Sequence, residues 1–317
     1  MTLGLGRGAT AMISYLEQLV ETGEYDKALE LGEQLLMSRE STENDLVAIQ
    51  CSLLRAQCSL GKLDSALTTG QLCLELARDL HEWDYFGLAC LYLGVAYARL
   101  HRHSEAVPLF AEYLDRLPMY TVSGKAQVMA WYNLGISYLK LDETKNAASA
   151  LVKAHALAAR AGSERTLHGI RQALIDAKLS TGDFASIPRL LAQCGRFLRQ
   201  NPSGFMNRES WLHHVDLRAR YAFSTKRLRR SKLLAVRGLE QASEGSEYPT
   251  FFHLLLAQIA LSEELGVESL GHAIAAQICA RNRQRPDLET SAAELVYTIS
   301  RTLPNAFAEM DRFYLTS

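Results

Sequence analysis

Proline and glycine are scarce in this chain of 317 residues, with 7 and 20 copies, while 48% of its residues are apolar. This composition excludes a disordered or collagen-like protein. The net charge is only −1, so no overall charge directs the chain to nucleic acid or to an acidic membrane. The most apolar stretch, Phe251 to Leu261, is interrupted by His253 and Gln258. Because a membrane span needs roughly 20 apolar residues, we expect no membrane association.

Sequence motifs of nucleotide, hydrolase and metalloenzyme chemistry are also absent. The chain has no GxxxxGKS/T, no GxGxxG after a strand, no GxSxG and no HExxH. His101 and His103 flank Arg102 in an expected turn, and His213 and His214 are neighbours on an expected helix, where they point to different sides. Neither pair has a second group of ligands at a diagnostic spacing. We therefore expect no catalytic residues, no metal site, no cofactor and no enzymatic activity.

The six cysteines form no CxxC pair, and the N-terminal MTLGLGRGATAM lacks the basic flank and long apolar core of an export signal. Both features predict a cytoplasmic protein with small, buried thiols, and redox or metal chemistry is the alternative. The cysteines are Cys51, Cys58, Cys73, Cys90, Cys194 and Cys279.

A recurring phrase is the strongest signal that the sequence does contain. It reads GEYDKAL at 23–29, GKLDSAL at 61–67, HRHSEAV at 101–107 and DETKNAA at 142–148, with weaker copies further on. One small or apolar position in each copy serves as an anchor. The anchors are Ala28, Ala66, Ala106, Ala147, Ile187, Ser231 and Ala273. Their spacing of about 40 residues indicates an array of repeats.

Each phrase is typical of a tight turn between two antiparallel helices. Gly23, Gly61 and Gly182 are expected to end the first helix of a pair in a left-handed conformation, which costs least without a Cβ. The anchor that follows is expected where the two helices approach closely. Gly94 and Gly135 lie inside expected helices, where glycine costs about 1 kcal/mol of helix propensity relative to alanine. A close helix crossing at both glycines explains that cost.

Two segments resemble the tetratricopeptide (TPR) repeat, whose pattern is Trp-x2-Leu-Gly-x2-Tyr followed by Ala, an aromatic residue and Pro. The matching residues are Leu93, Gly94, Tyr97, Ala106, Phe110 and Pro118 in one copy and Trp131, Leu134, Gly135, Tyr138 and Ala147 in the next. The period is similar to that of the longer repeats in kinesin light chains and in helical-repeat domains of bacterial regulators. The resemblance implies an all-α, TPR-like, right-handed superhelical solenoid of antiparallel helix pairs. We expect a disordered N-terminus at 1–8, about seven helix pairs at 9–287, and a C-terminal capping helix and tail at 288–317.

The same resemblance implies where a ligand binds, because the first helix of each TPR repeat lines a concave groove. Residues at the matching positions are expected to contact a protein partner, and a solvated helix face is the alternative for each. They are Arg55, Tyr92, Val95, Arg99, Asn133, Ile136, Lys140, Gln172, Asp176, Asp216 and Arg220. Asn133 matches a position whose amide can bond the backbone of an extended peptide through both its donor and its acceptor. No asparagine ladder and no carboxylate-gripping set accompany it, which argues against a chaperone adaptor.

Charge is distributed unevenly along the chain. Residues 1–120 carry 9 Lys and Arg against 17 Asp and Glu, whereas residues 121–240 carry 20 against 8. The basic middle peaks in one expected turn, at Lys226, Arg227, Arg229, Arg230 and Lys232. This basic patch is interpreted as a contact for phosphate, as a docking face for an acidic partner, or as a solvated turn.

Three functions remain open from the sequence. The first is a non-catalytic interaction module that takes a peptide or helix of a partner protein in its groove. The second is a ligand- or peptide-sensing regulatory domain of a bacterial signalling or transcription system. Since the first repeat begins near residue 9, such a sensor is expected to act through a partner or to be a fragment of a longer regulator. The third is a nucleic-acid-associated protein that uses the basic surface at 218–237, and homodimerisation is compatible with each.

Overall fold

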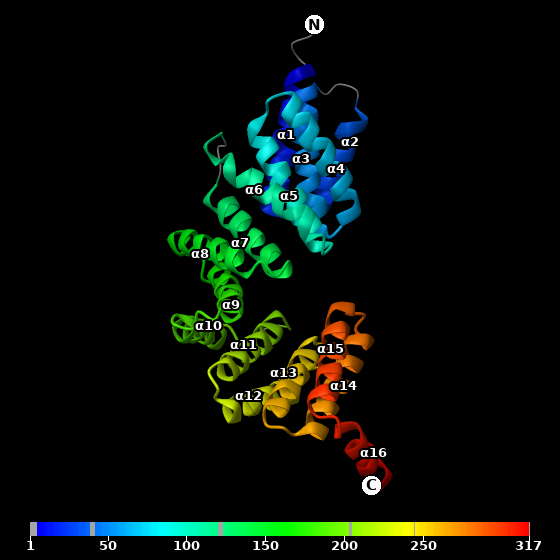
Figure 1. Cartoon of the computed structure of the whole chain (residues 1–317). Helices are drawn as coiled ribbons and strands as arrows, with labels where there is room; N and C mark the ends of the chain where they lie inside the picture. The colour runs from blue at the N-terminus through cyan, green and yellow to red at the C-terminus, as the bar shows by residue number, and fades with distance from the viewer. Residues whose placement is uncertain (1–4, 39–41, 120–122, 203–204, 244, 317) are drawn as a thin grey trace. The chain divides into compact units, whose positions relative to one another are not determined.

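The computed structural model describes residues 5–38, 42–119, 123–202, 205–243 and 245–316, and regular secondary structure in these ranges is entirely helical. Residues 1–4 of the expected disordered N-terminus lie outside the described ranges. The helices are α1 (Leu5–Thr22), α2 (Tyr25–Met37), α3 (Glu43–Leu60), α4 (Leu63–Asp79), α5 (Trp83–Arg99), α6 (His103–Asp115), the 3-10 turn η1 (Leu117–Met119), α7 (Gly124–Lys140), α8 (Thr144–Ala161), α9 (Glu164–Thr181), α10 (Ile187–Gln200), α11 (Phe205–Ser224), α12 (Leu228–Gln241), α13 (Tyr248–Ser262), α14 (Gly266–Asn282), α15 (Pro286–Thr302) and α16 (Ala306–Thr316) (Figure 1).

The seven anchors lie in the first two or three turns of even-numbered helices, and each is 0% exposed. Five of them are the fourth residue of their helix: Ala28, Ala66, Ala106, Ala147 and Ser231. A larger side chain would separate the paired helices at these points. The prediction is confirmed for these five, whereas Ile187 is the first residue of α10, and in α14 the fourth residue is the buried Ser269 and not Ala273.

The turns between paired helices take the left-handed backbone that the phrase predicts. The φ angles are +85° at Gly23, +78° at Gly61 and +74° at Gly182. In the copies without glycine, the same turn is made by residues with a Cβ, such as His101 at +60° and Asp142 at +58°. The turn geometry thus repeats even where its most favourable residue is missing.

Close helix crossings explain the internal glycines. A Cβ added to Gly135 would lie 2.6 Å from Cγ of Leu151, and one added to Gly94 would lie 2.8 Å from Cε1 of Phe110. Leu151 and Phe110 are both fully buried, so neither can withdraw into solvent. The expected close approach at Gly94 and Gly135 is confirmed.

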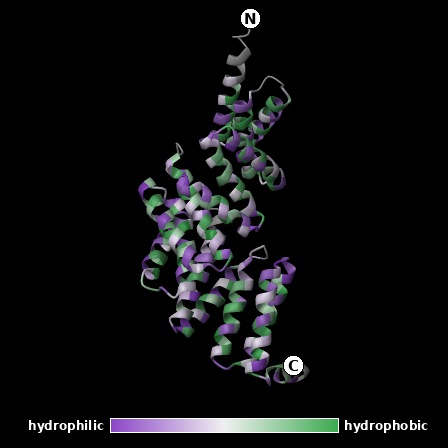
Figure 2. Cartoon of the chain, turned by 45° about the horizontal axis from the view of Figure 1, so that its top comes forward, coloured by the Kyte–Doolittle hydropathy of each residue, from purple (hydrophilic) through white to green (hydrophobic). Residues whose placement is uncertain are grey.

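The chain divides into two compact units, residues 1–173 and 174–317. In the first unit the odd-numbered helices form one layer, in which α3 contacts α1 and α5, and α5 contacts α7. The even-numbered helices pack against this layer, and the largest core cluster includes Phe86, Phe110 and Tyr113. Apolar residues recur along every helix between polar ones, as the helical period requires (Figure 2).

The second unit repeats this arrangement. Here α13 lies in contact with both α11 and α15, while α12 and α14 pack beside them. Phe252 of α13 is fully buried among residues of α11 and α12. Ala306 of α16 joins the buried cluster of Ala273 and Ile299, so α16 covers apolar surface of α14 and α15.

The six cysteines, all within the described ranges, are free thiols, and five of them are buried. Burial raises the pKa of Cys58 and of Cys90 to about 12. Such thiols stay protonated and unreactive at neutral pH, which agrees with the predicted packing role. Among the described helices, none is long and apolar enough to cross a membrane.

Two half-buried histidines lie side by side in the second unit, and we expect them to make it sensitive to acid. Nδ1 of His253 lies 3.1 Å from Nδ1 of His272. Burial lowers the pKa of His253 to about 4, and the charge of His272 lowers it further. Burial also lowers the pKa of His272, although the nearby Glu268 opposes this change. Because both folded pKa values lie below the unfolded value of about 6.5, the unfolded chain takes up protons first as the pH falls.

We therefore expect the melting temperature to fall between pH 7 and pH 5, with the histidine pair costing on the order of 1 kcal/mol after allowance for solvent screening. Circular dichroism melts of the wild type and of His272→Gln at both pH values measure this. The variant should lose less stability on acidification than the wild type. An equal loss in both proteins would show that other groups cause the acid sensitivity.

Candidate functional site

The first helices of the N-terminal unit bring two of the expected groove residues together. The guanidinium of Arg55 in α3 lies over the ring of Tyr92 in α5, 5.5 Å from its centroid. Burial raises the pKa of Tyr92, although Arg55 opposes the change. Arg99 has a different role, because its guanidinium donates to the carbonyl oxygen of Cys58. It thereby satisfies an acceptor in the last turn of α3 and ties α5 to that helix end.

Helix α7 carries three more of the expected contacts, Asn133, Ile136 and Lys140. Nδ2 of Asn133 donates to the carbonyl oxygen of Met129 at 2.9 Å, one turn earlier in the same helix. Lys140 is exposed at the end of α7. In this structure one of the two N–H groups of the Asn133 amide is thus engaged within its own helix, and a ligand that used this N–H would have to replace that bond. In α9, Gln172 is buried, with 6% of its surface exposed.

In the second unit the expected groove residues Asp176, Asp216 and Arg220 meet in one cluster with His213. Arg220 of α11 donates to Oδ1 of Asp176 in α9 and lies 3.5 Å from Oδ2 of Asp216. Nε2 of His213 lies 3.2 Å from Oδ2 of Asp176. These four residues, which we name the acid–arginine cluster, join the first helices α9 and α11. Only Asp216 is nearly inaccessible, with a side chain 4% exposed, whereas that of Arg220 is 37% exposed.

The pKa values in the acid–arginine cluster follow from burial and from pairing. Burial opposes the negative charge of Asp176, but Arg220 and His213 outweigh it and hold its pKa at about 2. Burial dominates at Asp216 and raises its pKa despite Arg220 and His213. At His213, burial lowers the pKa, but the hydrogen bond and the charge of Asp176 more than compensate and raise it. Arg220 is therefore the charge on which both carboxylates depend.

The residues of the basic patch separate into different environments. Lys226 occupies the left-handed turn position at φ +59° and is exposed. Nζ of Lys232 lies 2.6 Å from Oε1 of Glu268 and is paired. The ring of Tyr221 lies under Arg227, 5.1 Å from its guanidinium carbon, and Nε of Arg227 donates to Thr225 at 3.0 Å. Arg229 is exposed.

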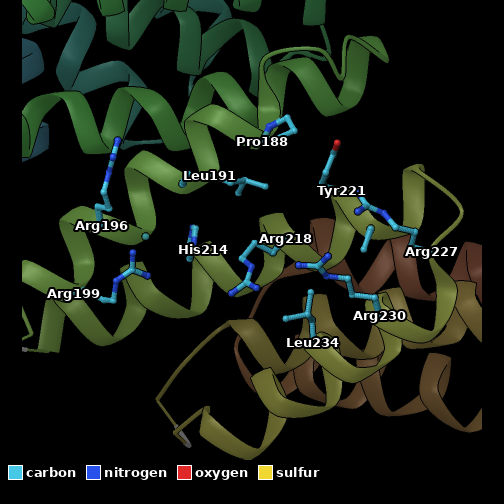
Figure 3. A pocket seen from close by; sticks show the side chains of 13 residues that line it. Pro188, Leu191, Arg196, Arg199, His214, Arg218, Tyr221, Arg227, Arg230 and Leu234 are labelled. Atoms are coloured by element: carbon cyan, nitrogen blue, oxygen red, sulfur yellow. The ribbon is translucent and has the colours of Figure 1, made fainter.

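The remaining arginine of the patch, Arg230, lines a cavity of about 520 Å³ together with Arg227. We name this cavity the arginine pocket (Figure 3). Its lining comes from α10, α11 and the first turns of α12, and Arg218 and Arg230 extend into the same opening. The lining residues are Pro188, Leu191, Ala192, Gly195, Arg196, Arg199, His214, Arg218, Tyr221, Ala222, Arg227, Arg230 and Leu234.

A glycine lets the pocket form. A Cβ on Gly195 would lie 3.2 Å from Nε2 of His214, so α10 approaches α11 closely at this point. Arginines of α10, of α11 and of the start of α12 line the same cavity.

Sequence reasoning missed His213 and two of the pocket arginines, Arg196 and Arg199, whereas Arg218 lies within the expected basic surface at 218–237. His213 was considered only as one of two adjacent histidines, whereas its partner Asp176 lies one helix pair earlier. Arg196 and Arg199 share a face of α10 by their i, i+3 spacing. That spacing next to Gly195 was an available signal, but their proximity to Arg218 depends on how the helices pack.

No protein-family model matches the chain, and no curated protein matches it. Solved structures do. NprR in complex with its cognate peptide NprX has a TM-score of 0.70 at 10% identity, covering 96% of this chain and 88% of that chain. The apo form of the quorum sensor NprR from B. thuringiensis has a TM-score of 0.66 at 10% identity, covering 92% and 82%.

A tetratricopeptide repeat protein from Parabacteroides merdae ATCC 43184 is also similar, with a TM-score of 0.53 at 15% identity, covering 92% of this chain and 99% of that chain. The fold is an all-α, TPR-like helical repeat. The TPR-like assignment agrees with the anchors, the left-handed turns and the layer of first helices. At these identities the similarity establishes the fold and leaves the ligand to the site itself.

Proposed function

We propose that the chain is a non-catalytic binding module that takes a peptide of a partner protein on the face of its first helices. The observation that carries this proposal is the acid–arginine cluster, which places partly exposed donors and acceptors on neighbouring first helices of one unit. Asp176 and Arg220 fix each other, so a ligand meets groups that are already ordered. Preorganised polar groups lose little entropy on binding, and they suit the backbone and termini of an extended peptide.

The similarity to NprR, whose solved structures include a complex with the peptide NprX and an apo form, supports the same proposal. It also supports the narrower alternative of a peptide-sensing regulatory domain. A sensor differs from a scaffold in one property, because its conformation must change when the ligand binds. Small-angle scattering with and without a bound peptide separates the two alternatives.

Selection of peptides from a random display library against the whole chain tests the proposal. The affinity of an enriched peptide is then measured by fluorescence anisotropy for the wild type and for two first-helix variants, Lys140→Ala and Arg220→Lys. We expect at least one of them to weaken binding about tenfold, the usual cost of a lost charged hydrogen bond. The matched control Lys145→Ala, an exposed lysine of the second helix α8, should bind as the wild type does.

Two results would contradict this proposal. One is that no peptide is enriched more strongly on this chain than on a control protein without TPR repeats. The other is that an enriched peptide binds both first-helix variants with wild-type affinity, which would place its site on another face.

A further inference from the structure

We infer that the arginine pocket binds a small organic phosphate of nucleotide size that carries at least two phosphoryl groups. This site lies among α10, α11 and α12, and its residues are separate from the acid–arginine cluster. Binding here is therefore additional to the peptide function proposed above.

The first argument is that positive charge in the pocket is not compensated. Five arginines line it, and the lining contains no Asp or Glu. Three arginines elsewhere in the same unit are paired with carboxylates: Arg220 with Asp176 and Asp216, Arg281 with Glu289, and Arg285 with Glu247 and Asp287. Within the described residues, none of the five pocket arginines has a carboxylate oxygen within 4.0 Å. An anion would relieve the repulsion that Arg230 and Arg199 exert on Arg218.

Arg218 shows this repulsion most clearly. It is half-buried in α11. Burial lowers its pKa, and the charges of Arg230 and Arg199 lower it further. Those two arginines come from α12 and α10, so three helices present like charges to one space. Guanidinium groups in such an arrangement match phosphate oxygens, which they can bind with two parallel hydrogen bonds.

The second argument concerns the size and the apolar wall of the pocket. A volume of about 520 Å³ lies within the range of small-molecule sites and is larger than a single phosphate requires. Pro188, Leu191 and Leu234 give the lining an apolar part. Tyr221 is held in place by Arg227 over its ring and by Phe184 at 6.2 Å. An aromatic ring beside apolar side chains suits a base or another flat organic group, with the phosphoryl groups directed to the arginines.

The third argument favours a small molecule over a nucleic acid. The pocket arginines converge from three helices on one cavity, whereas a nucleic-acid backbone is usually followed by a stripe of cations. Two members of the basic patch leave such a stripe incomplete, because Lys232 is paired with Glu268 and Arg227 lies over Tyr221. A nucleic acid is accordingly an outcome of the test and not the proposed ligand.

Isothermal titration of the whole chain with ADP, sodium pyrophosphate, adenosine and a 20-nucleotide single strand tests the inference. We expect ADP to bind, pyrophosphate to bind about tenfold more weakly because it lacks the organic part, and adenosine not to bind. The double variant Arg218→Gln/Arg230→Gln should weaken ADP binding about 100-fold, and Arg218→Lys should weaken it less because it keeps the charge.

Arg229→Gln is the matched control, since Arg229 precedes Arg230 in α12 but does not line the pocket. It should bind ADP as the wild type does, and circular dichroism of every variant checks that it is folded. The inference is overturned if ADP does not bind, if pyrophosphate binds as tightly as ADP, or if Arg229→Gln loses as much affinity as the double variant Arg218→Gln/Arg230→Gln. It is equally overturned if only the single strand binds, which would indicate a nucleic-acid surface.

Discussion

Replacement of Arg220 by methionine is expected to lower the free energy of unfolding by about 3 kcal/mol at pH 7, because it leaves a buried carboxylate without its counter-charge. Asp216 is 3% exposed and has Arg220 at 3.5 Å, while Asp176 accepts a hydrogen bond from the same guanidinium. The expected loss of unfolding free energy is smaller than for a fully buried ion pair, because the side chain of Arg220 is 37% exposed and solvent screens its charge. Urea titration followed by circular dichroism measures the change.

The pH dependence of this loss has a definite sign. The folded pKa of Asp216 is already raised by burial, and it should rise further without Arg220. A carboxyl group with a raised folded pKa contributes stability below its unfolded pKa of about 3.9 and loses it as the pH rises through the folded value. Arg220→Met should therefore lose less stability at pH 4 than at pH 7. In the wild type, Asp176, with a pKa of about 2, acts in the opposite sense and loses its contribution only as the pH falls toward that value.

A second substitution separates charge from packing in this variant. Asp216→Asn in the Arg220→Met background removes the unpaired charge and should recover about half of the lost stability at pH 7. If Arg220→Met is as stable as the wild type, the acid–arginine cluster contributes nothing to the fold. If the double variant gains nothing, the loss comes from packing and not from charge.

Gly135→Val is expected to destabilise the first unit by about 3 kcal/mol through overpacking. The new Cβ would lie 2.6 Å from Cγ and 2.9 Å from Cδ2 of Leu151, and 3.4 Å from the carbonyl oxygen of Ala147. Leu151 and Ala147 are fully buried, so the helices α7 and α8 would have to move apart. Gly135→Ala should cost less, because the gain in helix propensity of about 1 kcal/mol offsets part of the strain.

A glycine in open surroundings provides the control. A Cβ added to Gly271 in α14 meets no atom within 4 Å. Gly271→Ala should therefore stabilise the chain by about 0.5–1 kcal/mol. Thermal melts of the three variants compare these effects directly. Equal melting temperatures for Gly135→Val and Gly271→Ala would disprove the tight crossing of α7 and α8.

The spacing of the repeats predicted the fold because the residues that determine this fold act locally. An anchor such as Ala66 is buried where two helices meet, and Gly61 precedes it in a left-handed turn. Both features depend on a few neighbouring residues and recur along the chain, so the sequence displays them directly. The turn at His101 shows the limit of this reasoning, because its left-handed backbone is imposed by the helices on either side and is not favoured by the residue.

The binding surfaces were predicted only in part. The TPR resemblance placed Asp176, Asp216 and Arg220 on first helices, and it placed those helices side by side. That His213 bonds Asp176, that Arg99 is engaged at the end of α3, and that Gln172 is buried depend on contacts between different helices.

The sequence by itself determined the helical repeat, the positions of its turns and the small residues at its helix crossings. Only the tertiary structure decided which charges meet. Arg199, Arg218 and Arg230 lie on three helices, and their convergence on one pocket depends on how α10, α11 and α12 pack together. Such arrangements arise from packing summed over many side chains. For that reason the charge pattern along the chain indicated a basic region, whereas the arginine pocket was recognisable only in the folded protein.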